Sequence, residues 1–152
     1  MAPKTCHLWT MRGSMPRCMA EDTVFLDTSG VYAWINRNDP WHAAMCELPK
    51  KKSRLVLTDY IVDEACSLFV ARKIPHQRRR LFHLLDHSRI ITLSWIGPGL
   101  FAQARDWMLQ YEDQPFSFTD CTSFACMKHL GLTEAASTDQ HFRSAGFAPL
   151  FT

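Results

Sequence analysis

The sequence of 152 residues has no apolar run that approaches the roughly 20 residues a membrane-spanning helix needs. Its N-terminus lacks the apolar core of a secretory signal peptide. Both absences argue against a membrane or secreted protein, so we expect a cytoplasmic one. Apolar residues make up 47% of the chain and charged residues 21%, which is typical of a folded globular protein and not of a disordered one.

An excess of charge of one sign is also missing, because 17 Lys and Arg residues face 15 Asp and Glu residues, for a net charge of +2. This balance does not indicate a nucleic-acid binder, and any affinity for RNA has to come from local patches. The six cysteines include no Cys-x-x-Cys pair, so a structural zinc site has no support in the sequence. We interpret the cysteines in the apolar, helix-like stretches as buried, reduced thiols.

The chain shows no internal repeat and no low-complexity segment. Residues 1–20 lack sustained periodicity, and we expect there a flexible N-terminal extension or a coding start placed upstream of the true one, followed by one domain over residues 21–152. The patterns predict strands at 24–26, 54–58, 90–95, 133–137 and 147–151, and helices at 31–35, 40–48, 59–72, 75–87, 98–111 and 120–130. For the second helix, Asp39 is the expected N-cap and Pro40 the first helical residue.

Strands that alternate with helices of this length imply crossover connections and a mainly parallel sheet covered by helices on both faces. The expected fold class is therefore a three-layer α/β/α domain. In such sheets, binding sites lie beyond the carboxyl ends of the strands. Asp27 and Asp139 each lie where a predicted strand gives way to the next element.

The acidic residues that could form such a site also have ordinary structural interpretations. Asp120 begins an apolar helix and suits a simple cap, and Asp139 suits a turn or N-cap. Glu64 is more informative, because it lies at the edge of the apolar stripe on its helix, whereas Asp63 points nearly the opposite way. A carboxylate at such a border is costly unless it is paired or bound to a metal, and a salt bridge to an Arg remains an alternative.

Carboxylates gathered in one cleft repel each other, and a divalent cation relieves this repulsion. Ligands that are all oxygen atoms favour Mg²⁺ or Mn²⁺ over zinc. Such an ion binds phosphate, polarises it and lowers the pKa of its own water. Hydrolysis of a phosphodiester is the chemistry that follows most naturally.

Four stretches resemble the PIN-domain family, particularly its VapC-type toxin branch. They are VFLDTS at 24–29, LTDYIVDE at 57–64, FTDCTSF at 118–124 and STDQHFRSAGF at 137–147, in the family's order and at family-like spacing. The resemblance covers the chain from about Thr23 to its C-terminus. The departure is the N-terminal extension, since relatives usually place the first acid a few residues from the start.

The resemblance implies a metal-dependent endoribonuclease that uses Mg²⁺ or Mn²⁺. The expected catalytic and metal-binding acids are Asp27, Glu64, Asp120 and Asp139. Thr28, Ser29 and Thr119 are the expected supporting polar residues. By the same resemblance, the protein is the toxin of a toxin–antitoxin pair, a homodimer that cuts RNA and is silenced by a cognate antitoxin.

A basic stretch around residue 75 has two interpretations, a solvated helix face or an RNA-binding surface that neutralises phosphates beside an acidic site. Its members are Arg72, Lys73, Arg78, Arg79 and Arg80. His83 and His87 have the spacing of two zinc ligands but no third partner, so a surface pair is the simpler interpretation. The tryptophans 34, 41, 95 and 107 are expected in the core or in dimer contacts.

Three alternatives stay open at this point. A PIN-like domain can bind RNA or a partner without cutting, although the intact acid set argues against this. A phosphoacceptor domain with Asp27 as its target lacks the phosphate-binding glycine pattern and lysine context. A PIN nuclease can also act in RNA processing, outside a toxin–antitoxin system.

Overall fold

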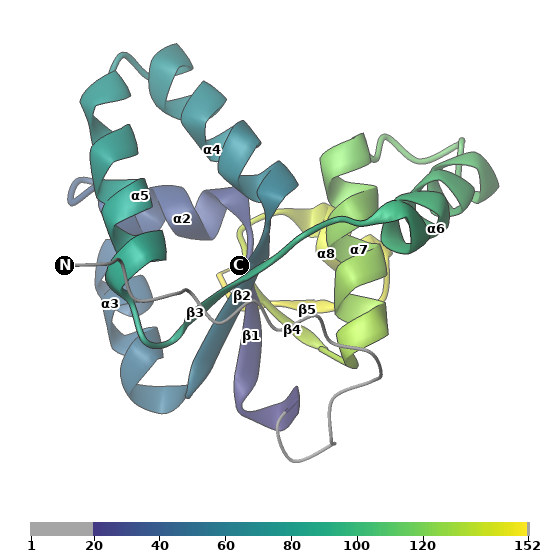
Figure 1. Cartoon of the computed structure of the whole chain (residues 1–152), viewed down its shortest axis with the longest axis horizontal. Helices are drawn as coiled ribbons and strands as arrows, with labels where there is room; N and C mark the ends of the chain where they lie inside the picture. Colours follow the sequence, from purple (N-terminus) through teal and green to yellow (C-terminus); the bar gives the residue numbers. More distant parts are fainter. Residues whose placement is uncertain (1–19, 152) are drawn as a thin grey trace, which may run out of the picture.

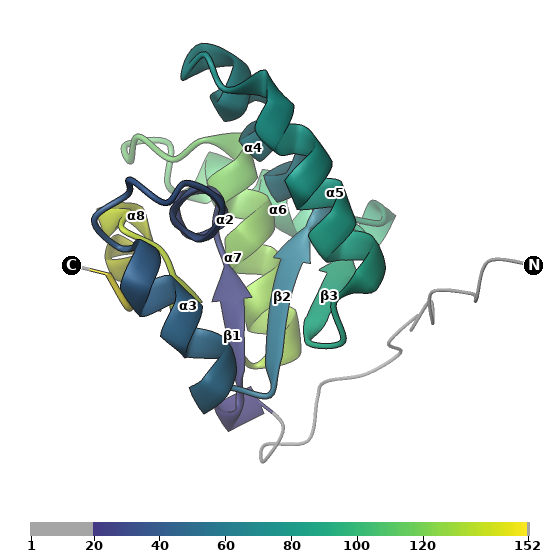
Figure 2. The same ribbon diagram turned by 90° about the vertical axis from the view of Figure 1, so that its left-hand side faces the viewer.

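The computed structural model describes residues 20–151, and the predicted N-terminal extension therefore lies outside the described residues. A five-stranded sheet forms the centre, in the order β3-β2-β1-β4-β5. All its neighbours pair in parallel, and in Figure 2 the arrows of β1, β2 and β3 run the same way. The strands are β1 (Thr23–Leu26), β2 (Arg54–Thr58), β3 (Ile91–Ser94), β4 (Glu134–Ala136) and β5 (Ala148–Pro149).

Helices cover both faces of the sheet, which confirms the predicted three-layer α/β/α class. Figure 1 shows α2 (Thr28–Ile35), α3 (His42–Lys51) and α5 (Arg78–His87) on one side, with α6 (Pro98–Gln110), α7 (Phe118–Leu130) and α8 (Gln140–Ser144) on the other. Helix α4 (Asp59–Ala71) continues from β2, contacts α2 and α7, and is joined to α5 by the short 3₁₀ turn η1 (Pro75–Gln77). Within residues 20–151, no helix has the length and apolar character to cross a membrane.

The sheet is buried where the chain is most apolar. Every residue of β1 is buried, as are the last four residues of β2, which is what continuous apolar strands covered on both faces require. Phe124 of α7 and Phe25 of β1 both pack against Phe142 of α8, with ring centroids 5.3 Å and 6.2 Å apart. Strand β1 is therefore fixed at the centre of the molecule.

The first turn of α2 lies directly against the end of β4. A Cβ atom at Gly30 would lie 2.2 Å from the carbonyl oxygen of Ala136 and 2.9 Å from Cδ1 of Leu26. Only glycine permits this approach. The close packing fixes the position of the chain that follows β1 relative to the chain that follows β4.

Several predicted boundaries were wrong. Asp39 and Pro40 do not begin α3, which starts at His42 after the N-cap Trp41, because the carboxylate of Asp39 instead accepts from the Trp41 amide at 2.8 Å in the preceding turn. The same helix runs past Pro49 to Lys51, since the Lys52 amide still finds the Leu48 carbonyl.

Three other elements differ from the prediction at their ends. Helix α2 begins at Thr28 because Asp27 caps it, and α7 begins at Phe118 because Ser117 caps it. The predicted last strand shrinks to Ala148–Pro149. Helix α8 was not predicted, because its five residues are too short to show periodicity.

Candidate metal-binding active site

The carboxylate of Asp27 lies at the carboxyl end of β1 and is only 7% exposed. Its Oδ2 atom accepts hydrogen bonds from the hydroxyls of Ser29 at 2.9 Å and Ser137 at 2.8 Å. Burial raises the pKa of Asp27 from about 3.8 to about 6, although these hydroxyls work in the opposite direction. Asp27 is thus held in one orientation at a place where its negative charge is unfavourable.

Glu64 is brought to this acid by α4. The helix starts directly at the end of β2, where the Thr58 hydroxyl accepts from the Ile61 amide at 3.2 Å as an N-cap. The hydroxyl of Thr28, the residue after Asp27, donates to the Glu64 carboxylate. The charge of Glu64 also contributes to the raised pKa of Asp27, so the two acids repel each other across Thr28.

Asp120 is fixed by the first turn of α7. Its carboxylate accepts from the Ser117 amide at 2.8 Å, and its own amide donates to the Ser117 hydroxyl at 3.0 Å, which together form a capping box. Nδ1 of His141 lies 3.1 Å from the same Oδ2 atom of Asp120. Oδ2 of Asp120 therefore takes part both in the capping box and in the contact with His141.

Asp139 is joined to both sides of the site. It is the N-cap of α8, with its Oδ1 accepting from the His141 amide at 2.9 Å, and its Oδ2 lies 3.4 Å from Nδ1 of His141. Its own amide donates at 2.9 Å to the hydroxyl of Ser137, the same residue that donates to Asp27. Asp120, Asp139 and His141 each offer a ligand atom within 4.8 Å of the others.

The four acids form two linked pairs in this geometry. Asp27 lies with Glu64, Asp120 lies with Asp139, and Ser137 connects the pairs. Over residues 20–151, neither Asp27 nor Glu64 belongs to a group of three ligands as close as the one around His141. The atoms that could bind a metal are carboxylate oxygens and one imidazole nitrogen. This set fits Mg²⁺ or Mn²⁺ and differs from a zinc site built from thiolates.

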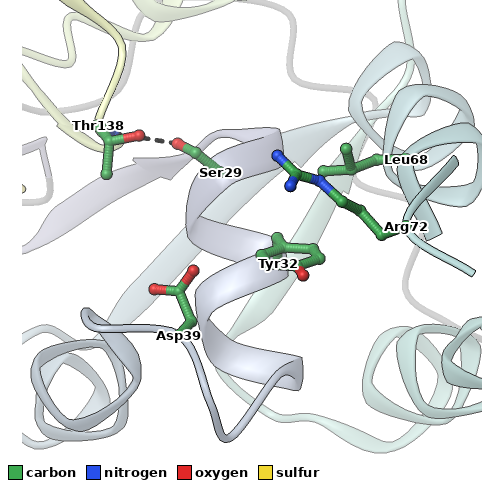
Figure 3. A pocket seen from close by; sticks show the side chains of 6 residues that line it. All are labelled: Ser29, Tyr32, Asp39, Leu68, Arg72 and Thr138. Carbon is green, nitrogen blue, oxygen red and sulfur yellow. Dashed lines mark hydrogen bonds between the residues drawn. The ribbon is translucent and has the colours of Figure 1, made fainter. Parts of the chain in front are cut away.

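A small hollow adjoins the acids. Its volume is about 180 Å³, and it is lined by Ser29, Tyr32, Asp39, Leu68, Arg72 and Thr138. Figure 3 shows Arg72 reaching over Tyr32 towards Ser29, while Asp39 faces the hollow from the other side. Ser29 forms part of its wall and also binds Asp27, so the hollow and the acidic site share a residue.

The sequence profile described as the PIN domain matches residues 24–148 of this chain. The chain belongs to the PIN-domain family. A curated relative of this PIN domain is the 23S rRNA-specific endonuclease VapC20 of Mycobacterium tuberculosis, 29% identical over 125 residues that make up 82% of this chain and 95% of the relative. The predicted resemblance is thereby confirmed.

Solved structures agree with this assignment. The crystal structure of M. tuberculosis VapC20, described as a sarcin-ricin loop cleaving toxin, superposes with a TM-score of 0.75 at 25% identity, over 84% of this chain and 98% of that one. FitAcB from Neisseria gonorrhoeae gives a TM-score of 0.57 at 18% identity, over 83% and 95% of the two chains. The second likeness supports the fold alone.

Two residues of this PIN domain's site were missed by the sequence analysis. Ser137 follows β4 as Asp27 follows β1, and the pairing of Leu26 with Ala136 makes them neighbours. The signal in the sequence was the position of Ser137 at the carboxyl end of the strand predicted at 133–137, but only the strand register of the structure brings it next to Asp27. His141 stands two residues after Asp139, but only the unpredicted helix α8 turns it towards Asp120.

The predicted supporting residues differ in what they do. Thr28 and Ser29 bind Glu64 and Asp27 through their hydroxyls. Thr119 takes part through its backbone carbonyl, which accepts from the hydroxyls of Thr122 at 2.8 Å and Ser123 at 2.9 Å. In the described structure, Thr119 therefore stabilises the first turn of α7.

The predicted basic stretch separates into two parts. Arg72 lines the hollow, whereas Arg78 donates to the Pro75 carbonyl at 2.9 Å and Arg80 to the Ile35 carbonyl at 3.2 Å. Lys73 has a φ of 60°, in the left-handed region, where the chain leaves α4. Only Arg72 of this stretch is a lining residue of the hollow beside the acids.

Other predicted features have structural explanations. His83 and His87 stack on the exposed face of α5, with ring centroids 4.3 Å apart, and are outside the candidate metal group found in residues 20–151. Cys46, Cys66, Cys121 and Cys126 are free thiols. Trp34, Trp41 and Trp107 pack against the core, whereas Trp95 is 61% exposed.

Proposed function

We propose that this PIN domain is a metal-dependent endoribonuclease that hydrolyses RNA phosphodiester bonds, and that it is the toxin of a toxin–antitoxin pair. The observation that carries the proposal is a set of four acids at the carboxyl edge of a PIN-domain sheet, connected through the hydroxyls of Thr28 and Ser137 and the ring of His141. The acids are Asp27, Glu64, Asp120 and Asp139. The similarity to an endonuclease specific for 23S rRNA supports RNA as the substrate.

The four acids are the proposed metal ligands, and the ion is Mg²⁺ or Mn²⁺. A bound cation would offset the repulsion between Asp27 and Glu64 and the cost of burying the Asp27 charge, which is the electrostatic reason that the residues fit one. When bound, such an ion supplies Lewis-acid activation of the phosphate and of an attacking water.

The remaining polar residues of the site have positioning roles in this proposal. The hydroxyl of Thr28 orients Glu64, and those of Ser29 and Ser137 hold Asp27, whereas Ser117 holds the Asp120 carboxylate through its backbone amide. Carboxylates that are already oriented lose little rotational freedom when they meet a cation or a phosphate. Replacing one of these hydroxyls is therefore expected to lower the rate of cleavage while the protein still folds.

The proposal extends to partners and location. A toxin of this kind would act in the cytoplasm, where its RNA substrate is, as a homodimer that its cognate antitoxin silences. The name of VapC20 makes 23S ribosomal RNA, and its sarcin-ricin loop, the first substrate to test.

The decisive experiment uses the purified full chain, ribosomes and isolated 23S rRNA, with Mg²⁺, Mn²⁺ or EDTA. We expect cleavage that needs the metal and that Glu64→Gln reduces by at least 100-fold, on the scale of losing a catalytic electrostatic group. The matched control is Asp63→Asn, which alters the exposed neighbour on the same helix and should cut like the wild type.

The proposal fails if the folded protein binds RNA without cutting it in either metal, which would indicate a non-catalytic binding module. Cleavage of RNA without any antitoxin encoded beside the gene would retain the nuclease but refute the toxin role. In that case the protein would belong to RNA processing.

A further inference from the structure

Arg72 differs from the rest of the basic stretch in its surroundings. Its guanidinium carbon lies 5.9 Å from the centre of the Tyr32 ring, within the range of a cation–π contact. The Tyr32 ring is stacked in turn on the fully buried Phe69, with centroids 6.3 Å apart, and its hydroxyl accepts from the side-chain amide of Asn36 at 3.0 Å. An exposed arginine is thus supported by an aromatic ring that is itself fixed from two directions.

The charge of Arg72 contacts an aromatic ring and not an acid of the described residues. Across residues 20–151, no carboxylate forms an ion pair with it, and its side chain borders the hollow beside the acids. A guanidinium placed on an aromatic ring keeps its N–H donors free at its edge, where they match two oxygens of a phosphate. The hollow has the volume of roughly six water molecules, enough for a phosphate group and part of a ribose.

The other walls of the hollow suit the sugar–phosphate chain. The Thr138 amide donates to the Ser29 hydroxyl at 3.0 Å (Figure 3). Because Ser29 also binds Asp27, this wall is continuous with the acidic site. On the other side, the carboxylate of Asp39 is a hydrogen-bond acceptor, which suits the donor of a ribose 2′-hydroxyl. A positive group beside four acids also counters their repulsion of the RNA backbone.

We infer that the hollow between α2 and α4 is a subsite for the RNA backbone, in which Arg72, held by Tyr32, binds the phosphate next to the one that is cut. The inference rests on the proposed nuclease function and deepens it by assigning one residue to one substrate position. It assigns this contact to Arg72 and not to Arg78 or Arg80, whose guanidinium groups donate to backbone carbonyls.

The test measures RNA binding separately from cutting. The probe is a fluorescein-labelled hairpin with the sequence of the sarcin-ricin loop, with Ca²⁺ in place of Mg²⁺ and a gel to show that the RNA stays intact. Arg72→Gln is expected to bind about 10-fold more weakly and to lower the slope of log affinity against log salt by about one. Arg89→Gln is the matched control, because it removes an exposed charge just before β3, at the amino edge of the sheet, and should not change binding.

A scan of methylphosphonates then locates the contact. Each probe has one neutral linkage, and one position should weaken binding by the wild type about 10-fold but have no further effect on Arg72→Gln. If Arg72→Gln binds like the wild type, or if no position shows this dependence, the inference is overturned, and Arg72 is free for another partner such as an acidic protein segment.

Tyr32 provides a second test. Tyr32→Phe keeps the ring under Arg72 and should keep the affinity, whereas Tyr32→Leu should lose part of it, with circular dichroism melts to show that both fold. Equal affinity of the two variants would refute the role of the ring. Because the scan needs no cut, a protein that never cleaves would refute the proposed function while the scan still decides whether Arg72 binds a phosphate.

Discussion

The cost of burying the Asp27 charge can be measured without any substrate. With a pKa of about 6 in the folded protein and about 3.8 in the unfolded chain, its carboxyl group holds a proton more tightly when folded. Ionisation therefore favours unfolding. The stability is full below about pH 3.8, falls as the pH rises, and is reduced by the whole penalty above pH 6.

The size of the penalty follows from the two pKa values. It is about 1 kcal/mol at pH 4.5 and about 3 kcal/mol at pH 7.5, so raising the pH between them removes about 2 kcal/mol of stability from the wild type through this group. Asp27→Asn abolishes that dependence. The asparagine amide has its own cost beside the two serine hydroxyls, but this cost is the same at both pH values.

Urea unfolding in EDTA, followed by circular dichroism at pH 4.5 and pH 7.5, measures the difference. We expect the free energy of unfolding of Asp27→Asn minus that of the wild type to be about 2 kcal/mol larger at pH 7.5 than at pH 4.5, so the variant gains stability relative to the wild type as the pH rises, since other titrating groups cancel. Mg²⁺ at pH 7.5 should stabilise the wild type more than the variant, which lacks one of the four proposed ligands. Parallel pH profiles for the two proteins would refute the argument that burial makes this charge costly.

Three further changes test other parts of the structure. Gly30→Ala should destabilise the fold by more than about 2 kcal/mol because its Cβ meets the Ala136 carbonyl, whereas Gly99→Ala, with nothing within 4 Å, should be neutral or slightly stabilising in thermal melts. Ser117→Ala removes the cap of α7 and should cost about 1 kcal/mol, and an unchanged melting temperature would contradict the capping box. His141→Ala should raise the Mn²⁺ concentration for half-maximal cleavage about 10-fold, because Asp120 and Asp139 lose the ring between them; the same metal dependence as the wild type would rule out this positioning role.

The sequence predicted most of the strands and long helices because their apolar periodicity is local. β1 and β2 are continuous apolar runs, and α4 carries a clear stripe of buried residues, Ile61, Ala65 and Phe69. The caps were harder. Asp39 has the features of an N-cap, but its side chain closes a turn two residues earlier than the helix, and nothing local distinguishes these uses.

The site was predictable in its residue types and not in its connections. Four acids at strand ends and helix edges suggested a shared cleft, since parallel strands bring their carboxyl ends together. The hydroxyl of Ser137 connects Asp27 with the Asp139 amide, and His141 lies between two acids, only because β1 pairs with β4 and α8 turns back. Such contacts depend on strand order and register, which periodicity does not encode.

Because β1 pairs with β4, the site can be completed only after the C-terminal part of the chain has been synthesised. Asp27 is made early, but Ser137, which holds it, is 110 residues further along the chain. Contacts so distant in sequence form late, because a long loop must close first. Until β4 is in place, Asp27 lacks this serine and Asp120 lacks His141, so an incomplete chain has no assembled site. A protein with the proposed activity would therefore be harmless to the ribosome that is still making it.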